Sequence, residues 1–98
     1  MGKVIFSIKY DILPERREEY LDVIRELKNL IKAETLSEYR VFEHKNKKNK
    51  FEEVYYFDNY EAYESFDDVQ NERVEILMTK LSDIIKEQTT EYSTLYEV

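Results

Sequence analysis

The sequence contains no cysteine, one histidine and one glycine, and these absences exclude several kinds of functional site. Without cysteine there is no disulfide framework, no thiol nucleophile and no thiolate ligand for a metal. A single histidine, His44, excludes the HExxH zinc motif and other sites built from several imidazoles. A single glycine, Gly2, excludes GxGxxG and Walker-type phosphate loops. The sequence therefore predicts neither a metal site nor a bound cofactor.

Long apolar runs and an excess of positive charge are also missing. The longest uninterrupted apolar run covers only Val54 to Phe57, whereas a bilayer span needs about twenty residues. Lys9 and Asp11 interrupt the apolar stretch that a signal peptide would need near the N-terminus. The 22 acidic residues outnumber the 15 lysines and arginines, and the net charge of −7 opposes binding to nucleic acid or to anionic membranes. We expect a cytoplasmic protein.

The chain length and the spacing of apolar residues predict one domain, residues 1–98, built from strands and helices. Apolar residues alternate in four segments, which indicates strands, and recur every three or four residues in two others, which indicates amphipathic helices. Asp58 and Glu61 have the spacing of a capping box, and Asp67 and Asp68 are a candidate break in the second helix. The expected elements are strand 4–11, helix 14–33, strand 38–44, a lysine-rich hairpin loop 45–50, strand 51–57, helix 60–87 and strand 91–98.

The order β-α-β-β-α-β predicts an α+β fold of the ferredoxin-like type, a four-stranded antiparallel sheet with both helices on one face. The predicted face beneath the helices is nearly all apolar. The other face mixes apolar and polar residues, so we expect a second copy to cover it, sheet to sheet, and to enclose a space for a small aromatic ligand. Ordinary half-exposed residues on a monomer are the other interpretation. This mixed face comprises Ile5, Ser7, Lys9, Arg40, Phe42, His44, Val54, Tyr56, Ser93 and Leu95.

Three segments carry a resemblance to a known family. They are the strand and hairpin beginning Tyr39-Arg40-Val41-Phe42-Glu43, the strand Phe51 to Phe57 with the following Asp58 to Tyr63, and the turn Pro14 to Tyr20. Together they resemble the dimeric α+β-barrel proteins, in particular the antibiotic-biosynthesis-monooxygenase-like (ABM) domains. The resemblance spans nearly the whole chain.

The resemblance implies a homodimer in which two sheets form a shared barrel, with a pocket in each subunit. The family includes cofactor-free oxygenases that act on aromatic polyketides, haem-degrading oxygenases and members without an assigned activity. Phe57 and Phe66 stand where family members often carry Trp and His, and Ser7 falls near the Asn that the haem-degrading members use. These departures disfavour haem degradation.

Four residues of the mixed face are the candidate site residues. His44 is the candidate general base, because its unperturbed imidazole titrates near neutrality, although a surface histidine is the other interpretation. Arg40 is suited to hold a carboxylate or enolate oxygen, but we favour an ion pair across strands with Glu52 or Glu97. Tyr56 could stack on an aromatic ligand, and Ser7 would line the same pocket.

The residues and the resemblance together favour a small-molecule enzyme of the ABM-like kind, a cofactor-independent monooxygenase acting on an aromatic or polyketide-like substrate. The alternative is a non-catalytic homodimer that binds a small ligand or serves a regulatory role. That alternative draws on the missing Trp and His and on the scarcity of groups that titrate near neutrality. A surface that binds a different protein is a third interpretation.

Overall fold

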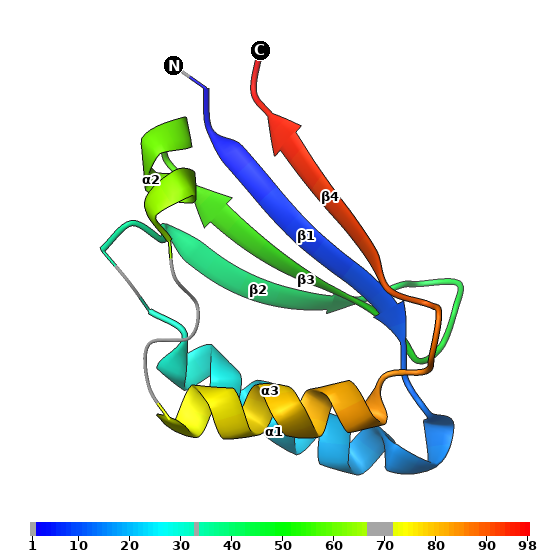
Figure 1. The fold of residues 1–98 in the computed structure, drawn as a ribbon. Coiled ribbons are helices and arrows are strands. Elements are labelled where there is room, and N and C mark those ends of the chain that lie inside the picture. Colours follow the sequence, from blue (N-terminus) through cyan, green and yellow to red (C-terminus); the bar gives the residue numbers. More distant parts are fainter. Residues whose placement is uncertain (1, 33, 67–71) are drawn as a thin grey trace.

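The chain folds into a four-stranded antiparallel sheet with its long helices packed against one face (Figure 1). The computed structural model describes residues 2–32, 34–66 and 72–98. The strands lie in the order β2-β3-β1-β4, which is the predicted ferredoxin-like sheet. The elements are β1 (Val4–Asp11), the 3₁₀ helix η1 (Pro14–Arg16), α1 (Arg17–Leu30), β2 (Glu38–Glu43), β3 (Lys50–Phe57), α2 (Tyr60–Ser65), α3 (Glu72–Ile84) and β4 (Glu91–Tyr96).

The helix boundaries differ in detail from those expected. Pro14 opens a single 3₁₀ turn, where its missing N–H costs no hydrogen bond, and α1 begins only at Arg17. The cap of α2 is Asn59, whose side chain accepts a 2.8 Å hydrogen bond from the Ala62 N–H, so the prediction of Asp58 as the capping residue is wrong. The predicted break at residues 67–68 lies outside the described residues.

The hairpin between β2 and β3 is closed by Asn49, which adopts a φ of 68°. Asparagine tolerates this left-handed conformation, which is otherwise typical of glycine. Arg17 at the start of α1 fastens the hairpin, because its guanidinium donates to both carboxylate oxygens of Glu43 at 2.6 and 2.9 Å. The same guanidinium lies over the Phe51 ring, 5.5 Å from the centroid.

One sheet face carries the core, as the alternation predicts. The register pairs Val4 with Phe57 and Tyr10 with Phe51, and these residues pack with the buried faces of α1 and α3. Strand β4 departs from the prediction. Tyr92 and Tyr96 lie on this face but remain 70% and 56% exposed, because the core does not extend to β4.

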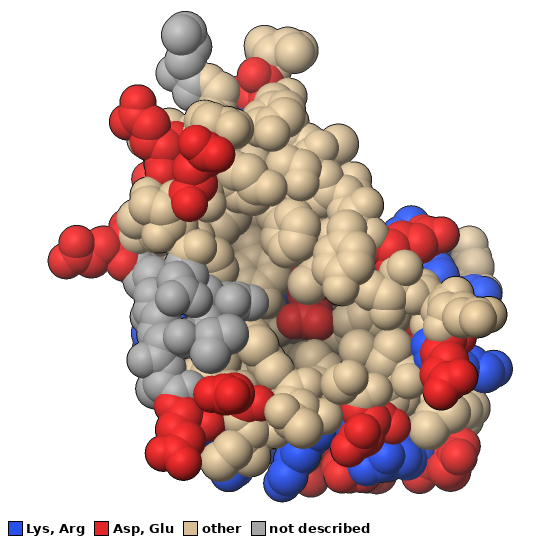
Figure 2. Space-filling model, in the orientation of Figure 1, with Lys and Arg blue, Asp and Glu red and all other residues tan. Residues whose placement is uncertain are grey.

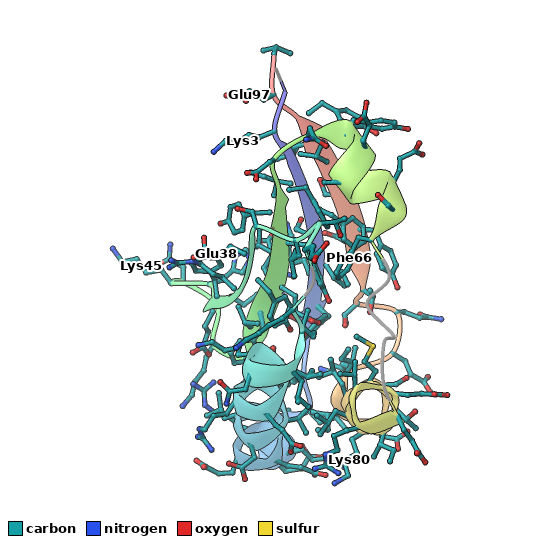
Figure 3. All side chains as sticks on the ribbon, turned by 90° about the vertical axis from the view of Figure 1, so that its left-hand side faces the viewer. Lys3, Glu38, Lys45, Phe66, Lys80 and Glu97 are labelled. Carbon is teal, nitrogen blue, oxygen red and sulfur yellow. The ribbon has the colours of Figure 1, made fainter. Side chains whose placement is uncertain are left out.

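The opposite face, here called the open face, has the predicted membership. The register places Ser7 beside Val54 and Ser93, and Arg40 on the other side of Val54. Figure 3 shows the sheet from the side, with Glu38 directed away from α2 and α3. Among the described residues, no helix is long and apolar enough to cross a membrane.

Candidate functional site

A cavity of about 430 Å³ lies between the core-bearing face of the sheet and α3. This volume falls in the range that accommodates a small organic ligand. In Figure 2 the same side of the molecule shows a hollow surrounded by uncharged residues, with acidic atoms recessed at its bottom. The lining comes from β1, β3, α3, β4 and the segment before β4, and comprises Ile8, Tyr10, Glu53, Tyr55, Met78, Leu81, Ser82, Ile85, Lys86, Glu87, Gln88, Thr90 and Tyr92.

The floor of the cavity holds a buried carboxylate. Glu53 is only 4% exposed, and its two oxygens accept hydrogen bonds from two different strands. The Tyr10 hydroxyl of β1 donates to Oε2 at 2.8 Å, and the Tyr39 hydroxyl of β2 donates to Oε1 at 2.7 Å. The Tyr20 hydroxyl of α1 lies 2.8 Å from that of Tyr10 and extends the network into the core. Both oxygens of Glu53 therefore have a phenol hydroxyl as a hydrogen-bond partner.

The tyrosines of this network stay protonated at any physiological pH. Burial raises the pKa of Tyr10 and Tyr39 far above the ordinary value of 10, and the neighbouring Glu53 charge raises it further. Burial is also the main reason that the pKa of Tyr20 is raised. These phenols therefore act as hydrogen-bond donors that hold the Glu53 carboxyl group.

The walls of the cavity are apolar and aromatic. Tyr55 and Tyr92 both lie against the Phe6 ring, with centroid distances of 5.8 and 6.2 Å, and Phe6 and Tyr92 are stacked. Leu81 of α3 forms part of the opposite wall. The segment after α3 closes one end, and there Gln88 adopts a φ of 63°, a conformation that costs energy for a residue with a long side chain. The cavity therefore presents aromatic surfaces above the Glu53 carboxyl, with Lys86 and Glu87 in the segment at its end.

The four site residues expected from the sequence lie elsewhere. Ser7, Arg40 and Tyr56 all lie on the open face, and none of them lines the cavity. His44 follows β2, and its Nε2 lies 3.4 Å from Oε1 of Glu52, on the open-face side of β3. The structure thus places Ser7 and Arg40 on either side of Val54, whereas His44 lies beyond the end of β2. Their roles in catalysis and substrate binding stay predictions.

The prediction that Arg40 forms an ion pair across strands is wrong. Its guanidinium pairs with the carboxylate of Glu38, two residues earlier on the same strand, and not with Glu52 or Glu97. Successive odd or even residues of a strand share a face, so this pair forms without a cross-strand neighbour. Both side chains are largely exposed, which makes the pair a weak contribution to stability.

Sequence reasoning missed Glu53. It stands beside Glu52 in an acidic pair, and such pairs are ordinarily read as solvated. The alternation nevertheless held the signal, because Glu53 shares the parity of Phe51, Tyr55 and Phe57, all of which are buried. A charged residue in register with core positions indicates a buried polar site.

Comparison with known proteins identifies the fold. No protein-family profile and no curated protein sequence matches the chain. Solved structures do match over nearly the full length. A conserved protein from Methanosarcina mazei aligns with a TM-score of 0.78 at 14% identity, covering 97% of this chain and 92% of the other. A protein from Bacteroides thetaiotaomicron, provisionally described as an antibiotic biosynthesis monooxygenase, aligns at 0.76 and 16%, covering 98% and 90%.

A third structure adds an activity to the comparison. A mutant of SnoaB, a cofactor-independent oxygenase from Streptomyces nogalater, aligns with a TM-score of 0.72 at 12% identity, covering 95% of this chain and 90% of the other. At these identities the similarity shows the fold, which is the ABM-like α+β fold that the sequence resembles. Within the described residues, no group of three histidines or acids is placed to hold a metal ion.

Proposed function

We propose that this protein is a small-molecule enzyme of the ABM-like kind, a cofactor-independent monooxygenase that oxidises an aromatic substrate in the cavity between the sheet and α3. One observation carries the proposal: a carboxyl group, that of Glu53, is buried at the floor of a cavity with aromatic walls. The ABM-like fold supports it, since structures with that fold include a cofactor-independent oxygenase.

The proposed oxidation requires a base that removes a proton from the substrate, in an apolar site. An aromatic substrate with an acidic CH₂ group gives a proton to the base, and the resulting carbanion passes its electrons to O₂ with formation of a C–O bond. The proton returns to the peroxide, the O–O bond breaks, and water leaves with the second hydrogen. The sum is CH₂ plus O₂ giving C=O plus H₂O. Glu53 is the proposed base, because a carboxylate in an apolar cavity is a stronger base than one in water.

The two tyrosines hold that base in place. Tyr10 and Tyr39 donate to different oxygens from strands on either side of β3, which limits rotation of the carboxylate. The sequence-based alternative of His44 as base, with Ser7, Arg40 and Tyr56 binding substrate, applies to the open face and remains a separate proposal.

We further propose that the open face pairs with a second copy of the chain. A stable interface takes roughly 800 Å² from each partner. Phe42 and Leu95, which are 46% and 59% exposed, belong to this face and would be covered.

Oxygen uptake tests the function directly. Purified protein would be incubated with a panel of anthrones and hydroxynaphthalenes in the presence of a chelator, with non-enzymatic oxidation subtracted. We expect one O₂ consumed per carbonyl product, and a loss of about a hundredfold or more in rate for Glu53→Gln. Glu52→Gln is the matched control, because it changes the charge equally on the open face. No uptake across the panel would contradict the proposal, and equal rates for Glu53→Gln and wild type would remove Glu53 as the base.

A further inference from the structure

The charge distribution of the cavity sets which ligands it accepts. We propose that Glu53 makes the cavity selective for uncharged aromatic compounds that donate a hydroxyl hydrogen bond, and that it excludes aromatic carboxylates. This inference rests on the proposed function for the identity of the site, and it adds the substrate class.

The carboxyl group of Glu53 is deep in the cavity. Glu53 lies at the floor of the cavity and is buried, so little solvent separates its carboxylate from a ligand that fills the space. Electrostatic interactions in such a site are much less screened than on the surface. A ligand carboxylate would be placed near a like charge after losing its own hydration, whereas a ligand hydroxyl would reach an acceptor.

The rest of the lining does not reverse this preference. Glu87 adds a second acid and Lys86 a single cation, and both are exposed residues of the segment after α3, where solvent weakens their effect. The remaining lining is uncharged. The tyrosines beside Glu53 donate to it, and their hydroxyl protons are therefore committed to the protein's own carboxylate and not offered to a ligand anion.

The aromatic walls define the shape of the ligand. Tyr55 and Tyr92, both packed on Phe6, provide flat surfaces on which a fused ring system can lie. A ring that enters between these walls carries its hydroxyl group toward the cavity floor. If an aromatic compound is synthesised with a carboxyl group, an earlier reaction must remove or esterify that group before the compound can bind in this cavity.

Three naphthalenes of similar size test the inference: 2-naphthol, 2-methylnaphthalene and 2-naphthoate. Calorimetric titration of the wild-type protein should give the tightest binding for 2-naphthol, with 2-naphthoate weaker by roughly ten- to a hundredfold. In Glu53→Gln the difference between 2-naphthol and 2-naphthoate should shrink to within about threefold, because the amide carries no charge. Glu52→Gln, on the open face, should keep the wild-type ratio.

The outcomes separate this inference from the proposed function. Binding of 2-naphthoate as tightly as 2-naphthol to the wild type overturns the inference without any variant, so a folding defect in Glu53→Gln cannot hide the answer. An unchanged ratio in a folded Glu53→Gln overturns it as well. The wild-type preference without oxygen uptake would leave the inference standing and contradict the oxygenase. Failure of all three compounds to bind would overturn both.

Discussion

The hydrogen bond from Tyr39 to Glu53 is the contact whose loss tells most about the site. Tyr39→Phe removes one hydroxyl and leaves the ring, which packs on Tyr55 with a centroid distance of 4.8 Å. The hydroxyl donates to Oε1 of Glu53 at 2.7 Å, and both groups are buried. The substitution therefore takes a donor from a buried charge and changes little of the apolar packing.

The expected cost follows from the charge of the acceptor. A hydrogen bond to a charged group contributes about 1.5–3 kcal/mol to the free energy of unfolding. For a domain of this length each kcal/mol corresponds to about 4–8 °C in the unfolding temperature. Tyr39→Phe should therefore lower the unfolding temperature by an amount on the order of 10 °C. The same change should reduce oxygen uptake, because the carboxylate loses a group that orients it.

Thermal unfolding followed by circular dichroism measures this effect, with Tyr96→Phe as the matched control. Tyr96 lies on the same sheet face but is 56% exposed, so loss of its hydroxyl should change the unfolding temperature by about 2 °C or less. The double variant Tyr10→Phe/Tyr39→Phe should show a coupling of at least about 0.5 kcal/mol, since both hydroxyls donate to one carboxylate. If Tyr39→Phe unfolded within about 2 °C of the wild type, the buried charged network would not exist as described.

Three other predictions concern the surface. Light scattering of the wild type should give a mass near twice 12.0 kDa. The variant Leu95→Glu, which places a charge on the open face, should give the monomer mass. A monomeric wild type would contradict the sheet-to-sheet dimer. The hydrogen bond from Arg17 lowers the pKa of Glu43 from its usual 4.5 to about 2. The pair therefore stabilises the fold above pH 4.5, by about 1 kcal/mol after solvent screening. This stabilisation is lost as the pH falls through 2. Urea unfolding of Glu43→Gln at pH 7 and pH 2 should show that loss already present at pH 7. His44→Ala and Arg40→Ala should keep oxygen uptake within about twofold of wild type if Glu53 is the base, and a hundredfold loss in either variant would move the site to the open face.

The fold could be predicted because local patterns determine it. Alternation and three-to-four spacing identified every strand and α1 with boundaries within a few residues. The helix expected over residues 60–87 is two helices, because α2 ends at Ser65, where Phe66 is extended, and α3 begins at Glu72. The same parity correctly divided the strand residues between the two faces, as the pairing of Ser7 with Val54 confirms. Details that depend on a single hydrogen bond were less accessible: Asn59 and Asp58 are both good capping residues, and only the backbone geometry decides between them.

The candidate site was harder to predict because it joins residues that are distant in the chain. Ser7, Arg40 and Tyr56 are predicted from the polar residues of the mixed face, whereas Glu53 occupies a position with the parity of the core residues. Tyr39 and Tyr92 illustrate the same limit. Alternation predicts both on the apolar face, yet one is 9% exposed and the other 70%, since β2 contacts α1 whereas the core does not extend to β4.

The sequence by itself determined the order of the elements, the two sheet faces and the absence of thiol, multi-histidine and glycine-loop chemistry, because these depend on residue type and on period along one chain. Only the tertiary structure decided that the hydroxyls of Tyr10 and Tyr39 meet one carboxylate, Glu53, and that α3 stands off from the sheet there and leaves a cavity. Strand register and helix placement bring these groups together across 43 and 14 residues of sequence. A buried carboxyl group forms a binding site only together with such neighbours. The periodicity of the sequence does not specify which residues these neighbours are.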